Sequence, residues 1–271
     1  TWGMYDEIIF ASDSRLSAGY RWDCAQKIFP IDGPNFCISF AGSADFAFPC
    51  IFQFQCMVKN YPKFSTGAAP ISLMVKDFIT IVNQLLGLVD DRILAQFNST
   101  TFLVAGYDFS NGEMYGKEIK YNKTSRKYEK FDFGGFRSGA AKAAIGFAGE
   151  GYQDFFSGLG KLVAKRKTEL NYEPLEVLAE IIYKQGKGST IGGSPQLVKV
   201  YRHRNYLPYA VKKNKEEGAA LFGRPLLDYE KTIYPIISIN DIPSGQYLTY
   251  PMSKNNKVRS QPGSLVRNKK K

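Results

Sequence analysis

The order of predicted elements places this 271-residue chain in the α+β class, as a four-layer αββα sandwich followed by a C-terminal extension. Two observations predict this class. Short apolar strand candidates open the chain and recur in its middle, and each strand group is followed by a pair of helix candidates. Because every sheet and helix must bury an apolar face, two sheets packed face to face with helices outside satisfy this order.

The first strands are predicted from apolar runs separated by turn residues. Residues 1–4 and 8–12 flank a turn at Tyr5-Asp6-Glu7 and predict a hairpin. Residues 26–31 and 35–41 predict two further strands around the turn Asp32-Gly33-Pro34.

Two helix candidates follow. Residues 44–59 are apolar and aromatic, and we expect a helix that starts or kinks near Pro49. Residues 70–94 carry apolar side chains at three- and four-residue spacing and predict one long helical region. Its apolar stripe should pack on the sheet.

The second half repeats the pattern. Residues 101–107 and 113–119 flank the turn residues 108–112 and predict a hairpin. The remaining candidates are strands at 128–133 and 143–147, helices at 151–167 and 174–185, and a strand at 197–202 that closes the core.

The first residue suggests a reaction chemistry. A threonine hydroxyl needs a base within reach, and an N-terminal threonine carries one in its own α-amine, whose usual pKa is about 7.7–8.0. A lysine beside the hydroxyl lowers the pKa of that amine and favours the alkoxide. Lys27 is the candidate lysine, and Asp13 and Arg15, which share one side-chain parity, can hold it in place. The backbone N–H of Gly42 is a candidate oxyanion donor.

Residues 1–210 resemble the N-terminal nucleophile hydrolase fold of proteasome β subunits and their bacterial relatives. The motifs that carry the resemblance are Ala11-Ser12-Asp13-Ser14-Arg15, Lys27, Ala41-Gly42-Ser43-Ala44-Asp45, Ala144-Ile145-Gly146 and Ile191-Gly192-Gly193. The resemblance implies Thr1 as nucleophile, Asp13, Arg15 and Lys27 as its charged support, and Gly42 as the oxyanion donor.

The chain departs from the family pattern around the terminal amine. Phe147 stands where active members have a serine, and Gly188 and Ile191 stand where they have an aspartate and a serine. Ser189, Thr190 or Ser194 are the nearby alternatives. Thr1 also stands twelve residues before Asp13 instead of sixteen, so an ordinary strand threonine, with the nucleophile further upstream, remains an alternative.

Composition argues against other chemistries. The single histidine, His203, offers nothing from which to build a histidine-based triad or metal site, and the four cysteines lack CxxC spacing and suit buried thiols. We therefore expect no cofactor and no metal.

The positive charge of the chain is concentrated at its end. The net charge is +11, and residues 251–271 contain seven basic residues and no acidic residue. That composition predicts a disordered tail that is either solvating or bound to an acidic partner.

The sequence thus predicts a core at residues 1–210, an ordered extension or assembly arm at 211–250 and a basic tail at 251–271. The leading hypothesis is a cytoplasmic, self-assembling threonine-type peptidase or amidohydrolase acting on a peptide or protein substrate. Its other expected partners are further copies of the chain and a regulatory ATPase or acidic partner of the tail, with no membrane. The alternative hypothesis is a catalytically inactive scaffold of the same fold.

Overall fold

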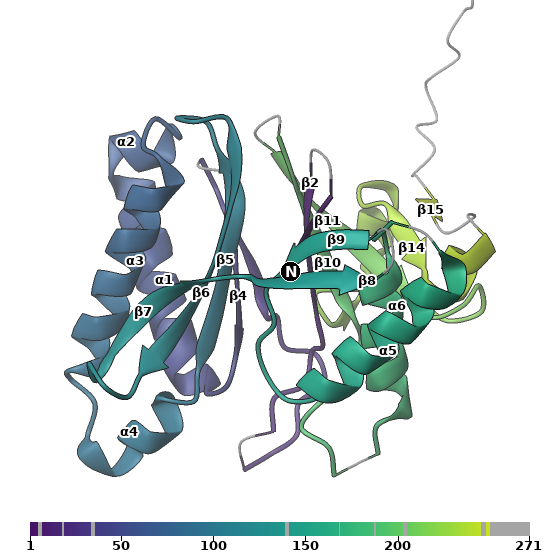
Figure 1. The fold of residues 1–271 in the computed structure, drawn as a ribbon, viewed down its shortest axis with the longest axis horizontal. Coiled ribbons are helices and arrows are strands. Elements are labelled where there is room, and N and C mark those ends of the chain that lie inside the picture. The colour runs from purple at the N-terminus through teal and green to yellow at the C-terminus, as the bar shows by residue number, and fades with distance from the viewer. Residues whose placement is uncertain are drawn as a thin grey trace, which may run out of the picture.

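The computed structural model describes residues 1–4, 7–17, 19–33, 36–138, 141–167, 169–186, 188–202, 205–244 and 248–249. The turn residues Tyr5, Asp6, Pro34 and Asn35, the histidine His203 and the predicted tail lie outside the described residues. The described elements form a mixed α/β fold with two sheets (Figure 1). No described helix combines the length and the apolar character needed to span a membrane.

The smaller sheet is fully antiparallel and has the strand order β3-β4-β5-β6-β7. Its strands are β3 (Ile28–Ile31), β4 (Phe36–Ala41), β5 (Thr101–Asp108), β6 (Glu113–Asn122) and β7 (Lys127–Asp132). On its outer face lie α1 (Ala44–Asn60) and α3 (Ile71–Leu86), with α2 (Pro62–Ser65) and α4 (Asp91–Phe97) beside them (Figure 1). Aromatic residues such as Phe54, Phe78 and Phe102 fill the space between these helices and the sheet.

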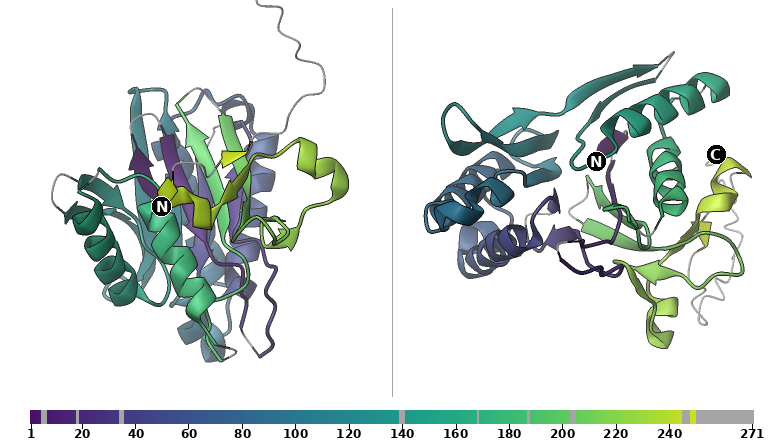
Figure 2. Two further views of the ribbon diagram at one scale, coloured as in Figure 1. Left: turned by 90° about the vertical axis from the view of Figure 1, so that its right-hand side faces the viewer. Right: turned by 90° about the horizontal axis from the view of Figure 1, so that it is seen from below.

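The larger sheet follows the order β13-β12-β11-β10-β2-β1-β9-β8. Its central strands are β1 (Trp2–Met4), β2 (Glu7–Ser12), β8 (Gly134–Ser138), β9 (Ala141–Ile145), β10 (Gln196–Tyr201) and β11 (Asn205–Lys212). The outer strands are β12 (Ala220–Leu221), β13 (Arg224–Pro225), β14 (Ile236–Ser238) and β15 (Leu248–Thr249). Helices α5 (Tyr152–Arg166) and α6 (Glu173–Lys184) cover its outer face (Figure 2).

The two sheets face each other, and β2 is buried on both sides. Ile9 packs toward α5 and α6, whereas Ile8 and Phe10 belong to the cluster between the sheets. Phe133 connects β7 of the smaller sheet to β8 of the larger one, and its ring packs against Gly116 and Gly146. Since a β-carbon at either glycine would collide with that ring, the Gly146 landmark serves the contact between sheets.

The predicted opening hairpin is confirmed, with Trp2 opposite Ile9. The predicted strands and the hairpin at residues 101–119 are also present, with shifts of a few residues at their ends. Helix α1 begins at Ala44 and runs through Pro49.

Three expectations about elements were wrong. The single helical region at 70–94 is two helices, because α3 ends at Gly87 and α4 starts at Asp91. Strand β8 was missed, because its two glycines give a weak strand signal and only pairing with β9 fixes it. The strand at 197–202 does not close the core, since β11 pairs with it and β14 pairs with β11. The expected boundary at residue 210 consequently falls inside β11.

Candidate active site

A cavity of about 630 Å³ brings together all five residues that the sequence singled out. The residues Thr1, Asp13, Arg15, Lys27 and Gly42 all contribute to its lining, although they come from the position before β1, the segment after β2, the segment before β3 and the turn after β4. The two sheets therefore place the predicted site residues around one space. What each side chain does there differs from residue to residue.

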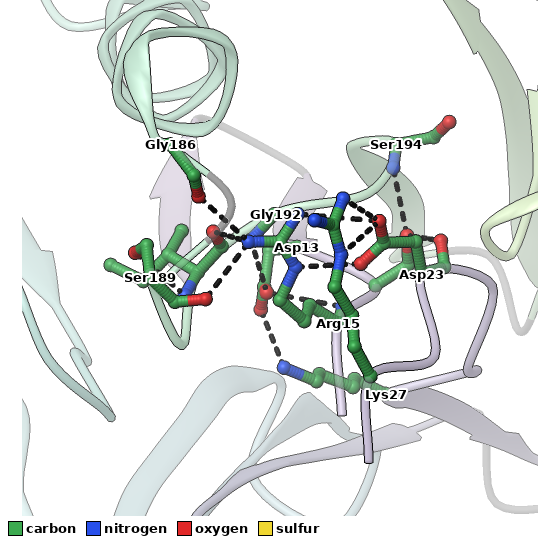
Figure 3. Close-up of polar contacts among 11 residues, drawn as sticks. Asp13, Arg15, Asp23, Lys27, Gly186, Ser189, Gly192 and Ser194 are labelled. Carbon is green, nitrogen blue, oxygen red and sulfur yellow. Dashed lines mark hydrogen bonds and ion pairs between the residues drawn. The ribbon is translucent and has the colours of Figure 1, made fainter. Parts of the chain in front are cut away.

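Asp13 and Lys27 form the ion pair that the sequence predicted. The Lys27 ammonium nitrogen lies 2.7 Å from one Asp13 carboxylate oxygen, and both side chains are largely buried (Figure 3). The other carboxylate oxygen accepts the backbone N–H groups of Gly192, at 3.1 Å, and Arg15, at 3.2 Å. Since a buried ion pair is tolerated only when its groups are also hydrogen-bonded, this arrangement fixes the Lys27 side chain at the cavity wall.

The fully buried side-chain amide of Gln196, which the sequence reading missed, links the backbone segments that carry Asp13 and Lys27. Gln196, the first residue of β10, donates from its amide nitrogen to the carbonyl oxygens of Asp13, at 3.1 Å, and Ala25, at 2.7 Å. Its amide oxygen accepts the backbone N–H of Lys27 at 3.1 Å. The available signal was a glutamine at the start of a strand that is rich in apolar residues, but its partners could be known only from the fold.

Arg15 has a different role from the one predicted. Its side chain is buried and pairs with Asp23, at 2.6 Å, rather than supporting Lys27 (Figure 3). The same guanidinium donates to three carbonyl oxygens of one loop, those of Gly186 at 3.3 Å, Ser189 at 2.8 Å and Ile191 at 3.0 Å. Arg15 thus fixes the 186–192 loop, while hydrogen bonds from Arg15 and Arg21 lower the pKa of Asp23 to about 2.

The Ile191-Gly192-Gly193 landmark is explained by this arginine and its neighbour. A β-carbon at Gly192 would collide with the Arg15 guanidinium, and one at Gly193 would collide with the Ser14 hydroxyl. That hydroxyl donates to the carbonyl oxygen of Asp23 and accepts the N–H of Ser194, both at 2.8 Å. Two glycines are therefore required for the loop to pass this close to the segment after β2.

Gly42 sits in the turn between β4 and α1 with a φ of +112°, a conformation that favours glycine. A β-carbon there would lie 2.6 Å from the Cα of Thr100. The following residue, Ser43, donates its backbone N–H to the Thr100 hydroxyl at 3.1 Å. Steric constraint alone therefore accounts for this glycine, and its position on the cavity lining is compatible with an oxyanion donor.

Thr1 is buried at the other side of the cavity and is fixed by its backbone. Its terminal nitrogen donates to the Gly146 carbonyl oxygen at 3.0 Å, and its own carbonyl accepts the Gly146 N–H at 2.9 Å. Burial lowers the pKa of the amine from 8.0 to about 5, and the negative charge of Glu118 acts in the opposite direction. The amine is therefore neutral near pH 7, as a general base must be.

The Thr1 hydroxyl is less well placed than the amine. Its oxygen is buried and has no hydrogen-bond partner among the residues described, so Lys27 is not bonded to it. In this geometry the hydroxyl oxygen is almost inaccessible to solvent.

Phe147, which stands where the family pattern has a serine, adds an aromatic side chain to the cavity lining next to Thr1. We call this part of the lining the amine side of the cavity. Phe147 packs on Tyr152 and Phe155, with ring centroids 5.4 and 5.2 Å apart. The printed contacts of the candidate substitutes do not include the Thr1 amine. The Thr190 hydroxyl donates to Glu150 at 2.5 Å, the Ser189 hydroxyl accepts the Ile191 N–H at 3.1 Å, and the backbone N–H of Ser194 donates to the Ser14 hydroxyl. The acidic group acting on the amine is Glu118 from the smaller sheet, which the sequence reading missed.

The described residues contain no cluster of three or more histidine, cysteine or acidic side chains suited to a metal ion. The cysteines are free, but the expectation that all are buried was wrong, because Cys56 is exposed on α1 and Cys24 is half-buried. Cys37 and Cys50 are buried, and burial raises the pKa of the Cys50 thiol to about 12.

The fold and the cavity define a mixed α/β protein with two largely antiparallel sheets and a site between their strand ends. No known protein family and no curated protein matches the sequence. Among solved structures, Anbu (ancestral beta-subunit) from Yersinia bercovieri is similar, with a TM-score of 0.53 and 14% identity over 76% of this chain and 85% of that chain. At this identity the likeness is one of fold alone.

Proposed function

We propose that this protein is a proteasome-like hydrolase of the threonine type, with Thr1 as N-terminal nucleophile. In this proposal the two sheets and their outer helices are the four-layer αββα sandwich of that fold. The observation that carries it is the cavity, which gathers a buried neutral amine at Thr1, the Asp13–Lys27 pair and Gly42. These are the base, the cationic support and the oxyanion donor that an N-terminal nucleophile needs.

The proposed reaction is cleavage of a peptide or related amide bond. After rotation of its side chain, the Thr1 oxygen attacks the carbonyl carbon while the terminal amine takes the hydroxyl proton. Lys27 favours the developing alkoxide, and the Gly42 N–H stabilises the oxyanion of the tetrahedral intermediate. The ammonium returns its proton to the leaving amine, and water then hydrolyses the acyl ester.

The setting that we propose is a self-assembled oligomer in the cytoplasm. Residues 1–210 would form the hydrolase core, and residues 211–250 would form an assembly arm. A regulatory ATPase or an acidic partner of the basic residues 251–271 would complete the system. The exposed side chains of Leu227, Tyr229 and Ile233 on the arm are consistent with an assembly role.

The alternative proposal is an inactive scaffold with the same fold. It is favoured by Phe147 in place of a serine and by the buried, unbonded Thr1 hydroxyl. Intact mass spectrometry before and after treatment with an epoxyketone or β-lactone distinguishes the two. An adduct mapped to Thr1 supports the hydrolase, whereas an unmodified protein whose N-terminus is verified as Thr1 supports the scaffold. An adduct on a residue upstream of Thr1, in a longer form of the protein, would move the nucleophile there.

A further inference from the structure

A buried acid that the proposed reaction has not used lies behind the peptide group that binds the Thr1 amine. Glu118 lies on β6 and is only 6% exposed. Its neighbour on the same face, Gly116, meets the Phe133 ring that bridges the sheets, whereas Ile119 on the other face belongs to the core under α1 and α3. Glu118 therefore points from the smaller sheet toward the larger one. A carboxylate in such a place requires a partner.

Its partner on the larger sheet is a single peptide group. The Phe147 N–H donates to a Glu118 carboxylate oxygen at 3.1 Å. The carbonyl of that same peptide group belongs to Gly146, and it accepts the hydrogen bond from the Thr1 amine at 3.0 Å. The amine, one peptide group and the carboxylate thus form a continuous chain of hydrogen bonds.

We propose that Glu118 is a positioning residue that stabilises the ammonium form of Thr1 through the Gly146–Phe147 peptide group. A positive charge on the amine polarises the peptide carbonyl, and the peptide N–H in turn strengthens its bond to the carboxylate. The neutral amine is stabilised less by the same chain of hydrogen bonds. Glu118 thereby supplies, from another sheet, the polar support that Phe147, Gly188 and Ile191 do not provide.

Glu118 also has a charged partner on its own strand. Lys120 on the same strand pairs with the second carboxylate oxygen and is 44% exposed. Leu103 on β5 and Phe131 on β7, which stand opposite Glu118 in the sheet, are uncharged. The purely structural reading is therefore a Glu118–Lys120 pair with no effect on the amine.

The role of Glu118 in catalysis rests on the proposed function. When the Thr1 O–H bond breaks and the proton forms a new N–H bond on the amine, the ammonium appears at the end of this chain. Its stabilisation by Glu118 makes the transfer more favourable and keeps the proton available for the leaving amine. Glu118 itself does not exchange a proton in this scheme.

The test compares the wild-type protein beginning at Thr1 with Glu118→Gln, which keeps an acceptor for the Phe147 N–H but removes the charge. The control is Glu113→Gln, at an exposed position of the same strand. The pKa of the amine is measured directly by competitive acetylation across pH, with mass spectrometry of the N-terminal peptide. The rate of β-lactone labelling is measured over the same range.

We expect Glu118→Gln to lower the amine pKa by roughly one unit and to move the acid limb of the labelling rate by the same amount, as loss of a nearby opposite charge does. Lys120→Gln should shift both in the opposite direction, and Glu113→Gln should shift neither. An unchanged amine pKa in a folded Glu118→Gln protein overturns this inference. If Glu118→Gln does not fold, Lys120→Gln takes its place, and an unchanged amine pKa in that variant overturns the inference.

The two proposals fail separately. A shifted amine pKa without any adduct on Thr1 in the wild-type protein overturns the hydrolase and leaves the electrostatic link in place. Labelling of Thr1 with the same pH profile in wild-type and Glu118→Gln proteins supports the hydrolase and removes Glu118 from it.

Discussion

The two sides of the cavity differ in how completely their polar groups are paired and hydrogen-bonded. On the lysine side, consisting of Asp13, Arg15, Lys27 and Gln196, the charged groups are paired and the buried amide has three partners. On the amine side, formed by Thr1 and Phe147, the Thr1 hydroxyl has no hydrogen-bond partner among the described residues, the neighbouring side chain is aromatic, and the acid behind the Gly146–Phe147 peptide group, Glu118, comes from the other sheet. The lysine side locks the segment after β2 to the 186–192 loop, so it would be required by the fold alone. Whether the protein is an enzyme therefore depends on the amine side.

The largest expected effect comes from breaking the lysine side. Lys27→Ala should reduce β-lactone labelling of Thr1 by at least about 100-fold, because it removes the group that supports the alkoxide. Circular dichroism and the rate of adduct formation check this. Lys59→Ala, at an exposed site on α1, is the matched control. Full labelling of a folded Lys27→Ala protein would show that the lysine side is structural only.

The amine side predicts a pH dependence of stability. The pKa of the Thr1 amine is about 5 in the folded protein and 8.0 in the unfolded chain. Between these values the unfolded chain binds the proton and the folded protein does not, so the free energy of unfolding rises with pH from about 5 to about 8. A difference of about three units corresponds to at most about 4 kcal/mol.

Chemical denaturation at a series of pH values measures this contribution. The matched control is the same protein acetylated at Thr1, which keeps an N–H for the Gly146 carbonyl but has no titrating amine. The two forms should differ in slope only in that pH window. Identical slopes would mean that the amine is solvated and that the amine side lacks a poised base.

The next effect separates the two arginines that share Asp23. Arg15→Lys should lower the free energy of unfolding by about 3 kcal/mol, since a lysine cannot reproduce the fork that binds Asp23 and three loop carbonyls. Arg21→Lys is the control, because the Arg21 side chain is 43% exposed and its pair with Asp23 should contribute little to the free energy of unfolding. Limited proteolysis should also cut the 186–192 loop faster in Arg15→Lys. Equal effects of the two substitutions would contradict the proposed clamp.

The smallest expected effect concerns the buried amide. Gln196→Met should lower the free energy of unfolding by about 2 kcal/mol, because it leaves the Lys27 N–H and two carbonyls without their partner. Gln53→Met, at an exposed position of α1, should be nearly neutral. Thermal unfolding of both variants measures the difference. No loss in Gln196→Met would mean that the two ends of the Asp13–Lys27 pair are held without Gln196.

Much of the fold could be predicted from local patterns. Apolar alternation and turn residues were sufficient for the hairpins, and three- and four-residue spacing was sufficient for α3. The failures that concern strands share one cause, which is pairing at long range. Strand β8 is held by β9 despite its glycines, and β11 and β14 extend the sheet beyond the strand that was expected to close it.

The sequence by itself determined which residue types are available for chemistry: an N-terminal threonine, the Asp13–Lys27 combination, the glycine landmarks and a single histidine. Only the tertiary structure decided how they are used. It directed Arg15 to a loop instead of to Lys27, gave Gln196 its three partners and brought Glu118 from β6 to the peptide group that holds Thr1. The reason is physical: hydrogen bonds and charge effects depend on distances of a few ångströms between segments that are more than a hundred residues apart or lie in different sheets.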